Sequence, residues 1–108
     1  MDYGIALSAL ADPTRRAVFE HLRHGPDCVG ALASRLPVSR PAVSQHLKVL
    51  KQAGLVIDRP DGARRVYCIE PEGLAELRGW LEQFWDDALD AFRNEVESTD
   101  KPRGRKQS

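Results

Sequence analysis

Apolar residues recur at intervals of three and four along most of the chain, the period of an amphipathic helix. This pattern predicts a short helix over 3–10 and a second helix that begins at Asp12 and Pro13 and ends at His24. A third helix is expected from Asp27 or Cys28 to residue 36, and a fourth over 39–52. After Gly54, the β-rich segments 55–57 and 66–69 flank 58–65, which holds a Pro-Asp-Gly turn, so a hairpin is expected there. A long last helix is predicted from Pro71 to about residue 96.

The fourth helix is the most informative element. Ser39 is a good N-cap, and Pro41 lies in the first turn, where its missing N–H costs nothing. Val43, Leu47 and Leu50 form a narrow apolar stripe, which predicts that only one side of this helix is buried. Hydroxyl, amide and cationic side chains, with small Pro and Ala residues, fill the first turns and the outer side: Ser39, Arg40, Pro41, Ala42, Ser44, Gln45 and Lys48. His46 lies at the edge of the stripe, where it either contacts DNA or packs.

Such a helix suits the DNA major groove. Gln pairs bidentately with adenine and Arg with guanine, Ser hydrogen-bonds to several base edges, and Ala or Pro can meet a thymine methyl group. The third and fourth helices, joined at Pro37–Val38, form a helix-turn-helix pattern. Arg59, Arg64 and Arg65 lie near the tip of the hairpin and mark it as a wing that approaches the DNA backbone or minor groove. We therefore predict a mainly α fold with a small β-hairpin, a winged helix-turn-helix.

Length and charge fit this interpretation. The 108 residues make one small domain over 1–97, followed by a basic tail, 98–108, that is expected to be disordered. The net charge is zero, but residues 35–65 hold seven basic and two acidic side chains, whereas 70–97 hold nine acidic and two basic ones. The basic middle would attract phosphate, although charge runs are also typical of solvated faces. The sequence shows neither a membrane-length apolar run nor a signal peptide, so a cytoplasmic protein is expected.

The last helix predicts a homodimer. Its apolar stripe is longer than so small a domain can cover, and its aromatic half would be exposed on a monomer. A two-fold partner that uses the same stripe, with the first helix alongside, would bury it and supply two reading helices for a pseudo-palindromic site. The expected interface residues are Tyr3, Ile5, Leu7, Leu77, Leu81, Phe84, Trp85, Ala88 and Phe92.

Four residues carry alternative chemistry. His21 and His24 either bind a metal or sit as cations at the end of a helix, and Cys28 is either a redox-sensitive thiol or a packing residue. Cys68 reads most simply as a packing residue in a strand. No phosphate loop, nucleophile elbow or metal-ligand cluster is visible, so we do not expect an enzyme or a cofactor.

These residues together resemble the ArsR/SmtB family of bacterial winged-helix repressors. The matching segments are Ala9–Arg16, Val38–Leu50, Gly54–Val56, Asp61–Tyr67 and Pro71–Leu77. The resemblance implies a cytoplasmic homodimer with element order ααααββα that represses its own or a neighbouring operon. It also implies that the reading segment is 39–48 and that Arg59, Arg64 and Arg65 are wing contacts.

The chain departs from the metal-sensing members of that family. The Cys-Val-Cys segment of those sensors corresponds here to Asp27-Cys28-Val29-Gly30, which lacks the second thiolate, and the last helix contains no His. Zinc and arsenic(III) favour thiolate and imidazole ligands, so the chain resembles the metal-independent members.

The sequence therefore predicts an autoregulatory repressor that binds double-stranded DNA. Arg40, Ser44, Gln45 and His46 are the candidates for reading bases, and Lys48 and the wing arginines are the candidates for holding phosphate. Two alternatives stay open: a regulator of the same fold released by thiol oxidation, a metal(loid) or a small ligand, and a protein-interaction module that does not bind DNA.

Overall fold

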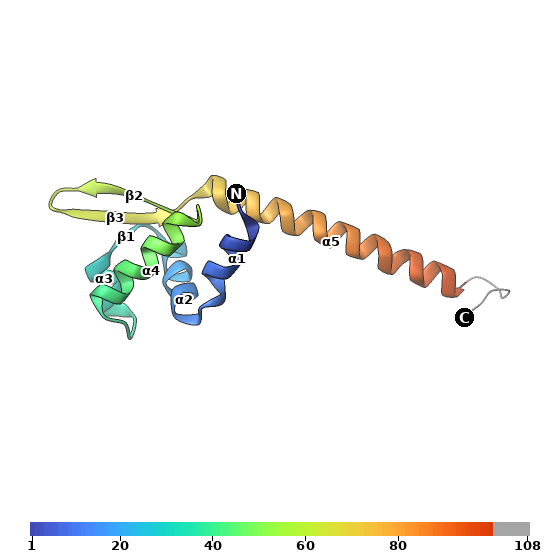
Figure 1. The fold of residues 1–108 in the computed structure, drawn as a ribbon, viewed down its shortest axis with the longest axis horizontal. Coiled ribbons are helices and arrows are strands. Elements are labelled where there is room, and N and C mark those ends of the chain that lie inside the picture. The colour runs from blue at the N-terminus through green and yellow to red at the C-terminus, as the bar shows by residue number, and fades with distance from the viewer. Residues whose placement is uncertain (101–108) are drawn as a thin grey trace. The chain divides into compact units, whose positions relative to one another are not determined.

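A computed structural model describes residues 1–100 of the chain and the side chains of residues 1–98. In chain order the elements are α1 (Tyr3–Ala11), α2 (Pro13–His21), the 3-10 helix η1 (Leu22–His24), β1 (Asp27–Cys28), α3 (Val29–Arg35), α4 (Arg40–Gln52), β2 (Val56–Asp61), β3 (Arg64–Ile69) and α5 (Pro71–Asp100) (Figure 1). The chain divides into two compact units, one over Met1–Leu77 and one from Arg78 onward. The predicted mainly helical fold with a β-hairpin is confirmed.

The boundary between α1 and α2 follows the predicted capping. The Asp12 carboxylate accepts hydrogen bonds from the backbone N–H groups of Thr14 and Arg15, and Pro13 occupies the first turn. Two arginines cap the C-terminal end of α1, a role that the sequence pattern does not indicate. Arg15 donates to the carbonyl oxygens of Ala9 and Ser8, and Arg16 donates to that of Leu10. Cations thus lie at the C-terminal end of α1, where free carbonyls and the helix dipole favour positive charge.

The start of the third helix differs from the prediction. Asp27 and Cys28 form a short strand, β1, and α3 begins at Val29. β1 pairs antiparallel with β3, with Asp27 opposite Tyr67 and Cys28 opposite Val66. The partner strand lies about forty residues further along the chain, so the local pattern held no sign of this pairing. The sheet order is β1-β3-β2 within the described residues.

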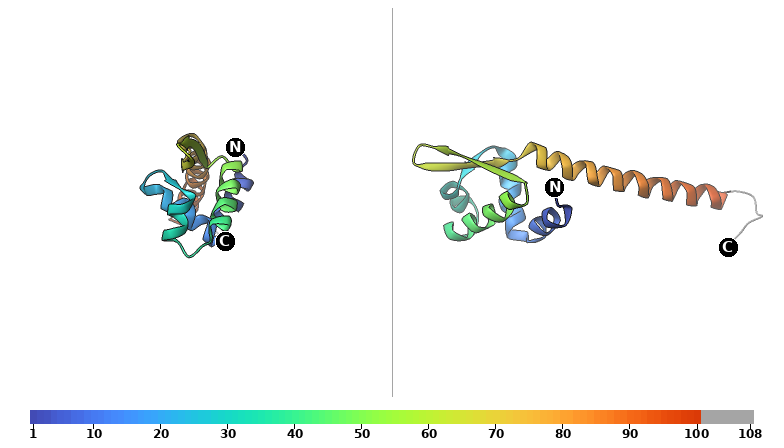
Figure 2. Two further views of the ribbon diagram at one scale, coloured as in Figure 1. Left: turned by 90° about the vertical axis from the view of Figure 1, so that its left-hand side faces the viewer. Right: turned by 45° about the horizontal axis from the view of Figure 1, so that its top comes forward.

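The hairpin is longer than predicted. β2 and β3 stay paired from Val56 with Ile69 to Asp61 with Arg64, so most of the segment 58–65 is strand rather than loop. Pro60 is tolerated inside β2 because that strand lies at an edge of the sheet, where a missing N–H costs no ladder bond. The turn is reduced to residues 62 and 63, with Gly62 at a φ of 65°. Figure 2 shows the hairpin projecting past α3 and α4.

One hydrophobic core joins the elements of the first unit. The largest fully buried side chains come from α2, α3, α4, the turn before β2 and the start of β2, and no polar residue among residues 1–98 is buried as a whole. The core residues are Ala6, Ala9, Val18, Leu22, Leu32, Val43, Leu47, Leu50, Ala53, Leu55 and Val56. Leu77, placed in the dimer interface by the sequence analysis, packs half-buried against this core.

The first turn of α5 is fixed by a close backbone approach. Gly73 is buried, and a Cβ at that position would lie 1.8 Å from the carbonyl oxygen of Gly54. Gly54 itself ends α4 with a φ of 82°, a conformation that glycine adopts without strain. The helix α5 continues to Asp100, four residues beyond the predicted end and three residues into the predicted tail. The remainder of that tail, 101–108, lies outside the described residues.

Candidate nucleic-acid interface

The helix α4 has one buried and one exposed side, as its pattern predicts. Val43, Leu47 and Leu50 are fully buried. Ser39 accepts a hydrogen bond at Oγ from the backbone N–H of Ala42, 3.3 Å away, and so caps the helix. Ala42 is half-buried, and the other predicted contacts of this segment, His46 apart, are exposed: Ser39, Arg40, Pro41, Ser44, Gln45 and Lys48. This face carries hydroxyl, amide and cationic groups that a DNA groove can accept.

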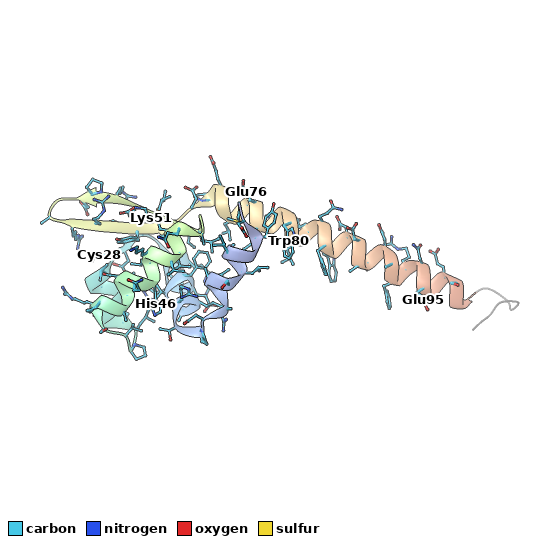
Figure 3. All side chains as sticks on the ribbon, in the orientation of Figure 1. Cys28, His46, Lys51, Glu76, Trp80 and Glu95 are labelled. Carbon is cyan, nitrogen blue, oxygen red and sulfur yellow. The ribbon has the colours of Figure 1, made fainter. Side chains whose placement is uncertain are left out.

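His46, labelled on α4 in Figure 3, is placed differently from these residues. It is half-buried, and it lies close enough to the Asp12 carboxylate at the start of α2 to act on it electrostatically. The backbone N–H groups of Arg15 and Thr14 lower the pKa of Asp12, Arg15 being the larger cause, and the charges of Arg15 and His46 add to this effect. The structure therefore groups His46 with the α2–α4 packing contact.

The three predicted wing arginines lie in paired strands, not in a loop. Arg59 is exposed on β2, opposite Val66. Arg64, at the start of β3, lies 3.6 Å from Asp61 in an exposed ion pair, and its Nη1 lies 3.7 Å from Sγ of Cys28. The three guanidinium groups therefore differ in their ion-pair partners. The shortest ion pair among them is that of Arg65 with Asp58.

Asp58 joins the wing to the last turn of α4. Its Oδ1 lies 2.7 Å from Nζ of Lys51 and its Oδ2 lies 2.5 Å from Nε of Arg65, while its side chain is only 6% exposed. The hydrogen bonds from Lys51 and, next, from Arg65 lower the pKa of Asp58, and Asp58 in turn raises the pKa of Arg65. Lys51 is labelled in Figure 3. The sequence pattern gives no sign of this network, because Lys51 and Asp58 become neighbours only through the turn at Gly54.

Arg40 is separated from the other candidates for base reading. Its guanidinium lies against α3, so close that a Cβ at Gly30 would be 2.9 Å from Nη2. It faces the same surface hollow as Cys28 and Arg64. Thus Ser44, Gln45 and Lys48 lie on the outer side of α4, whereas the Arg40 side chain turns toward the wing.

Comparison with known proteins assigns this arrangement to a family. A helix-turn-helix domain model matches residues 10–59. The chain is 61% identical over 93 residues to the HTH-type transcriptional regulator Rv2034 of Mycobacterium tuberculosis, covering 86% of this chain and 87% of that protein. It is 33% identical to the transcriptional repressor SdpR of Bacillus subtilis over 70% of this chain and 84% of that protein. The homodimeric winged helix-turn-helix DNA-binding domain Mb0332 of Mycobacterium bovis, an NMR structure, has a TM-score of 0.64 at 30% identity and covers 78% of each chain.

The chain belongs to the ArsR/SmtB family of winged helix-turn-helix transcriptional regulators. Like the family, it is a DNA-binding regulator and not an enzyme. In this family's terms, α3 and α4 are the helix-turn-helix and β2 with β3 is the wing. Among residues 1–100, no helix is both long enough and apolar enough to cross a membrane.

The residues expected at an ArsR-type dimer interface fall into two groups. Tyr3 and Leu77 are half-buried within the protomer. The others are exposed on α1 and α5, with exposed fractions of 57% for Leu81, 62% for Phe84, 63% for Trp85 and 65% for Phe92, and Ile5, Leu7 and Ala88 are exposed as well. Leu89 and Val96 on α5 extend the same exposed apolar set. Trp80, half-buried, and Phe84 lie with ring centroids 6.1 Å apart.

His21, His24 and Cys28 are the residues for which the sequence left metal or thiol chemistry open. Within the described part of the chain, no three His, Cys, Asp or Glu side chains come together as a metal site would require. Cys28 and Cys68 are both free and half-buried. His21 and His24 contact each other edge to face, with ring centroids 6.0 Å apart, at the end of α2 and in η1.

Proposed function

We propose that this chain is a sequence-specific repressor that binds a pseudo-palindromic operator as a homodimer and controls its own gene in the cytoplasm. The observation that carries the proposal is the division of α4: three leucine and valine side chains are fully buried, while Ser44, Gln45 and Lys48 are exposed side by side. Ser44 and Gln45 are assigned to base edges, and Lys48, Arg59 and Arg64 to phosphate. Repression by occupancy needs only tight, selective binding over a promoter.

The homodimer follows from the exposed face of α5. Aromatic and aliphatic side chains spaced over several turns are more than half exposed, which is costly in water and typical of an interface. A two-fold partner would place a second α4 at the neighbouring major groove, about one helical turn away. The homodimeric relative Mb0332 supports this arrangement.

The proposed regulator acts without a transition metal. The half-buried Cys28 has a guanidinium group, that of Arg64, as its neighbour, and a guanidinium is no metal ligand. A second candidate function is release from DNA when Cys28 is oxidised. The same contact favours it, because a sulfenate or sulfinate at this position would attract Arg64 away from the DNA backbone.

Gel-shift binding to the DNA upstream of the protein's own gene, with excess random competitor, tests the proposal. Retention of that DNA, unaffected by zinc, by a chelator or by oxidant, is expected for a metal-independent autorepressor. Oxidant-dependent release that Cys28→Ser abolishes would favour the second candidate. Affinity that does not fall as salt rises would exclude DNA reading and leave a protein-interaction module, because neutralised phosphates make binding strongly salt-dependent.

A further inference from the structure

A cavity of about 460 Å³ opens between the first turns of α3 and α4 and strand β3 of the wing. The wing is far from α3 in the sequence, and the hollow forms because β1 pairs with β3 and brings the start of α3 against the wing. Figure 3 labels Cys28, which lies at the end of β1 in this wall. The side chains that matter for its chemistry are Cys28, Gly30, Arg40, Arg64, Arg65 and Tyr67.

The positive charge in this wall is only partly neutralised. Arg65 is held by Asp58, and Arg64 has a long, exposed pair with Asp61. Arg40 forms no ion pair with any described side chain. Two guanidinium groups from different elements, Arg40 and Arg64, therefore face one cavity without a strong carboxylate partner.

The carboxylates near the cavity already have cationic partners. Asp27 is paired with Arg35 and also accepts the backbone N–H of Cys28, and Asp58 is shared by Lys51 and Arg65. No acidic side chain is among those that line the cavity. An oxyanion entering it would meet the guanidinium donors, and the nearest opposing charges would be Asp58, which is bound to Arg65, and Asp61, which is weakly paired with Arg64.

Gly30 leaves the space that the Arg40 guanidinium occupies. A Cβ at this position would lie 2.9 Å from Nη2 and 3.3 Å from Cζ of Arg40, so any other residue would push the guanidinium out. Glycine is a poorer helix former than alanine, and Gly30 lies in the first turn of α3. A residue that favours the helix less is thus present at the position where its missing side chain leaves room for the Arg40 guanidinium in the cavity.

We propose that this cavity binds a phosphate group, held by Arg40 and Arg64. Guanidinium forks bind phosphate oxygens bidentately, and two forks on one hollow are a recurring way to hold a dianion or a phosphodiester. The phosphate comes either from the DNA backbone beside α4 or from a small phosphate monoester, whose organic part the Tyr67 side of the wall would accept. In the first case Arg40 contacts the DNA backbone and does not read a base, and this case rests on the proposed function. The second case does not depend on DNA.

The free-phosphate source is tested by titrating ¹⁵N-labelled protein with inorganic phosphate and with phenyl phosphate, against sodium chloride at matched ionic strength. Saturable shifts of the Gly30, Cys28 and Tyr67 amides are expected from this source. Binding should weaken about tenfold or more in Arg40→Gln and in Gly30→Ala, as loss of a charged hydrogen bond implies. Gly30→Ala keeps every charge and moves only the guanidinium. Arg93→Gln, which removes the same charge from α5, is the matched control.

The DNA source is tested by the salt dependence of duplex binding. Each lost phosphate contact lowers the slope of log K against log salt by about 0.9. The double variant Arg40→Gln/Arg64→Gln should lower the slope by the equivalent of about two phosphate contacts, and Gly30→Ala by the equivalent of about one. Both changes should be the same on operator and on random DNA. Arg93→Gln should leave the slope unchanged. Circular dichroism melting of each variant verifies that it is folded.

The outcomes are separable. A lowered slope assigns the cavity to backbone phosphate, and saturable shifts with an unchanged slope assign it to a free monoester. Unchanged slopes together with no saturable shifts would overturn the proposal, as would a loss confined to operator DNA, which means that Arg40 reads a base. If the unaltered protein fails to bind any duplex, the proposed function is wrong, while the titration still decides whether the cavity holds phosphate.

Discussion

The Nζ atom of Lys51, in the last turn of α4, lies 2.7 Å from Oδ1 of Asp58 on β2. The other oxygen of the same carboxylate holds Arg65 on β3, so one acidic side chain connects the reading helix to both strands of the wing. The carboxylate thereby contributes to the relative orientation of α4 and the wing. Arg65 is also partly neutralised by this contact, so we expect it to be a weaker phosphate contact than Arg59 or Arg64.

Replacing Asp58 by Asn should loosen this connection. The variant keeps the shape of the side chain but loses two charge-assisted hydrogen bonds. Because Lys51 and Arg65 are both more than half exposed, we expect a loss in the free energy of unfolding of only about 1 kcal/mol. Urea denaturation measures it. The control is Asp61→Asn, whose pair with Arg64 is long and exposed and should change stability by no more than a few tenths of a kcal/mol.

Asp58 also predicts a pH dependence. Its pKa is lowered from the ordinary 3.8 by Lys51 and Arg65, so the folded state binds a proton less readily there than the unfolded state. The stabilisation is therefore complete above the unfolded value and is lost as pH falls through 3.8 toward the lower folded value. Asp12 contributes in the same direction. The difference in unfolding free energy between the unaltered protein and Asp58→Asn should shrink in this window. A difference that stays constant from neutral pH to pH 2 would contradict the assignment.

The close approach of Gly73 to Gly54 gives a sharp steric prediction. In Gly73→Ala the new Cβ would fall 1.8 Å from a backbone oxygen, so the start of α5 must move. We expect destabilisation of roughly 1–3 kcal/mol, as for other overpacked sites. Gly79→Ala is the matched control, since nothing lies within 4 Å of its Cβ, and it should stabilise by up to about 1 kcal/mol through helix propensity. Thermal melts of the two variants should shift in opposite directions.

These glycines mark the limit of what the sequence could predict. The stripe of Val43, Leu47 and Leu50 and the caps at Ser39 and Asp12 are local signals, and the structure confirms them. The pairing of β1 with β3, the approach of residue 73 to residue 54 and the hollow under Arg40 depend on segments that meet only after folding. Periodicity along the chain holds no information about such contacts.

The same distinction applies to the candidate interface. Helical spacing correctly separated the outer side of α4 from its buried stripe, but it could not show that His46 lies near Asp12 or that the Arg40 guanidinium lies against Gly30. Both residues lie near the boundary of the exposed face, where long side chains choose between neighbours on other elements. Gln45 lies at the centre of that face, away from this boundary.

Gln45 is therefore the best test of base reading. Gln45→Ala should weaken operator binding by about 1–3 kcal/mol, relax the preference at one base pair and leave binding to random DNA unchanged. Lys48→Ala, one turn along the same exposed face, should weaken binding to all sequences and lower the salt slope by about 1. Fluorescence anisotropy on operator and random duplexes distinguishes the two. Equal losses on both duplexes for Gln45→Ala would refute its reading role.

If the exposed face of α5 forms the dimer interface, a substitution in it should weaken dimerisation and operator binding together. Phe84 is 62% exposed in the protomer, so Phe84→Asp should not disturb the protomer's own core. If Phe84 lies in a two-fold interface, each buried ring is worth roughly 1.5–3 kcal/mol and the interface contains two of them. Sedimentation velocity should show dimers for the unaltered protein and mainly monomers for the variant.

Asn94→Asp is the control for Phe84→Asp, because it adds the same charge to α5 at an exposed position away from the apolar stripe, and it should stay dimeric. Operator affinity should fall steeply in Phe84→Asp alone, because a monomer reaches one half-site and loses the gain from binding two linked sites. A monomeric Phe84→Asp that binds the operator with full affinity would show that one α4 is sufficient and that the exposed face of α5 serves another partner.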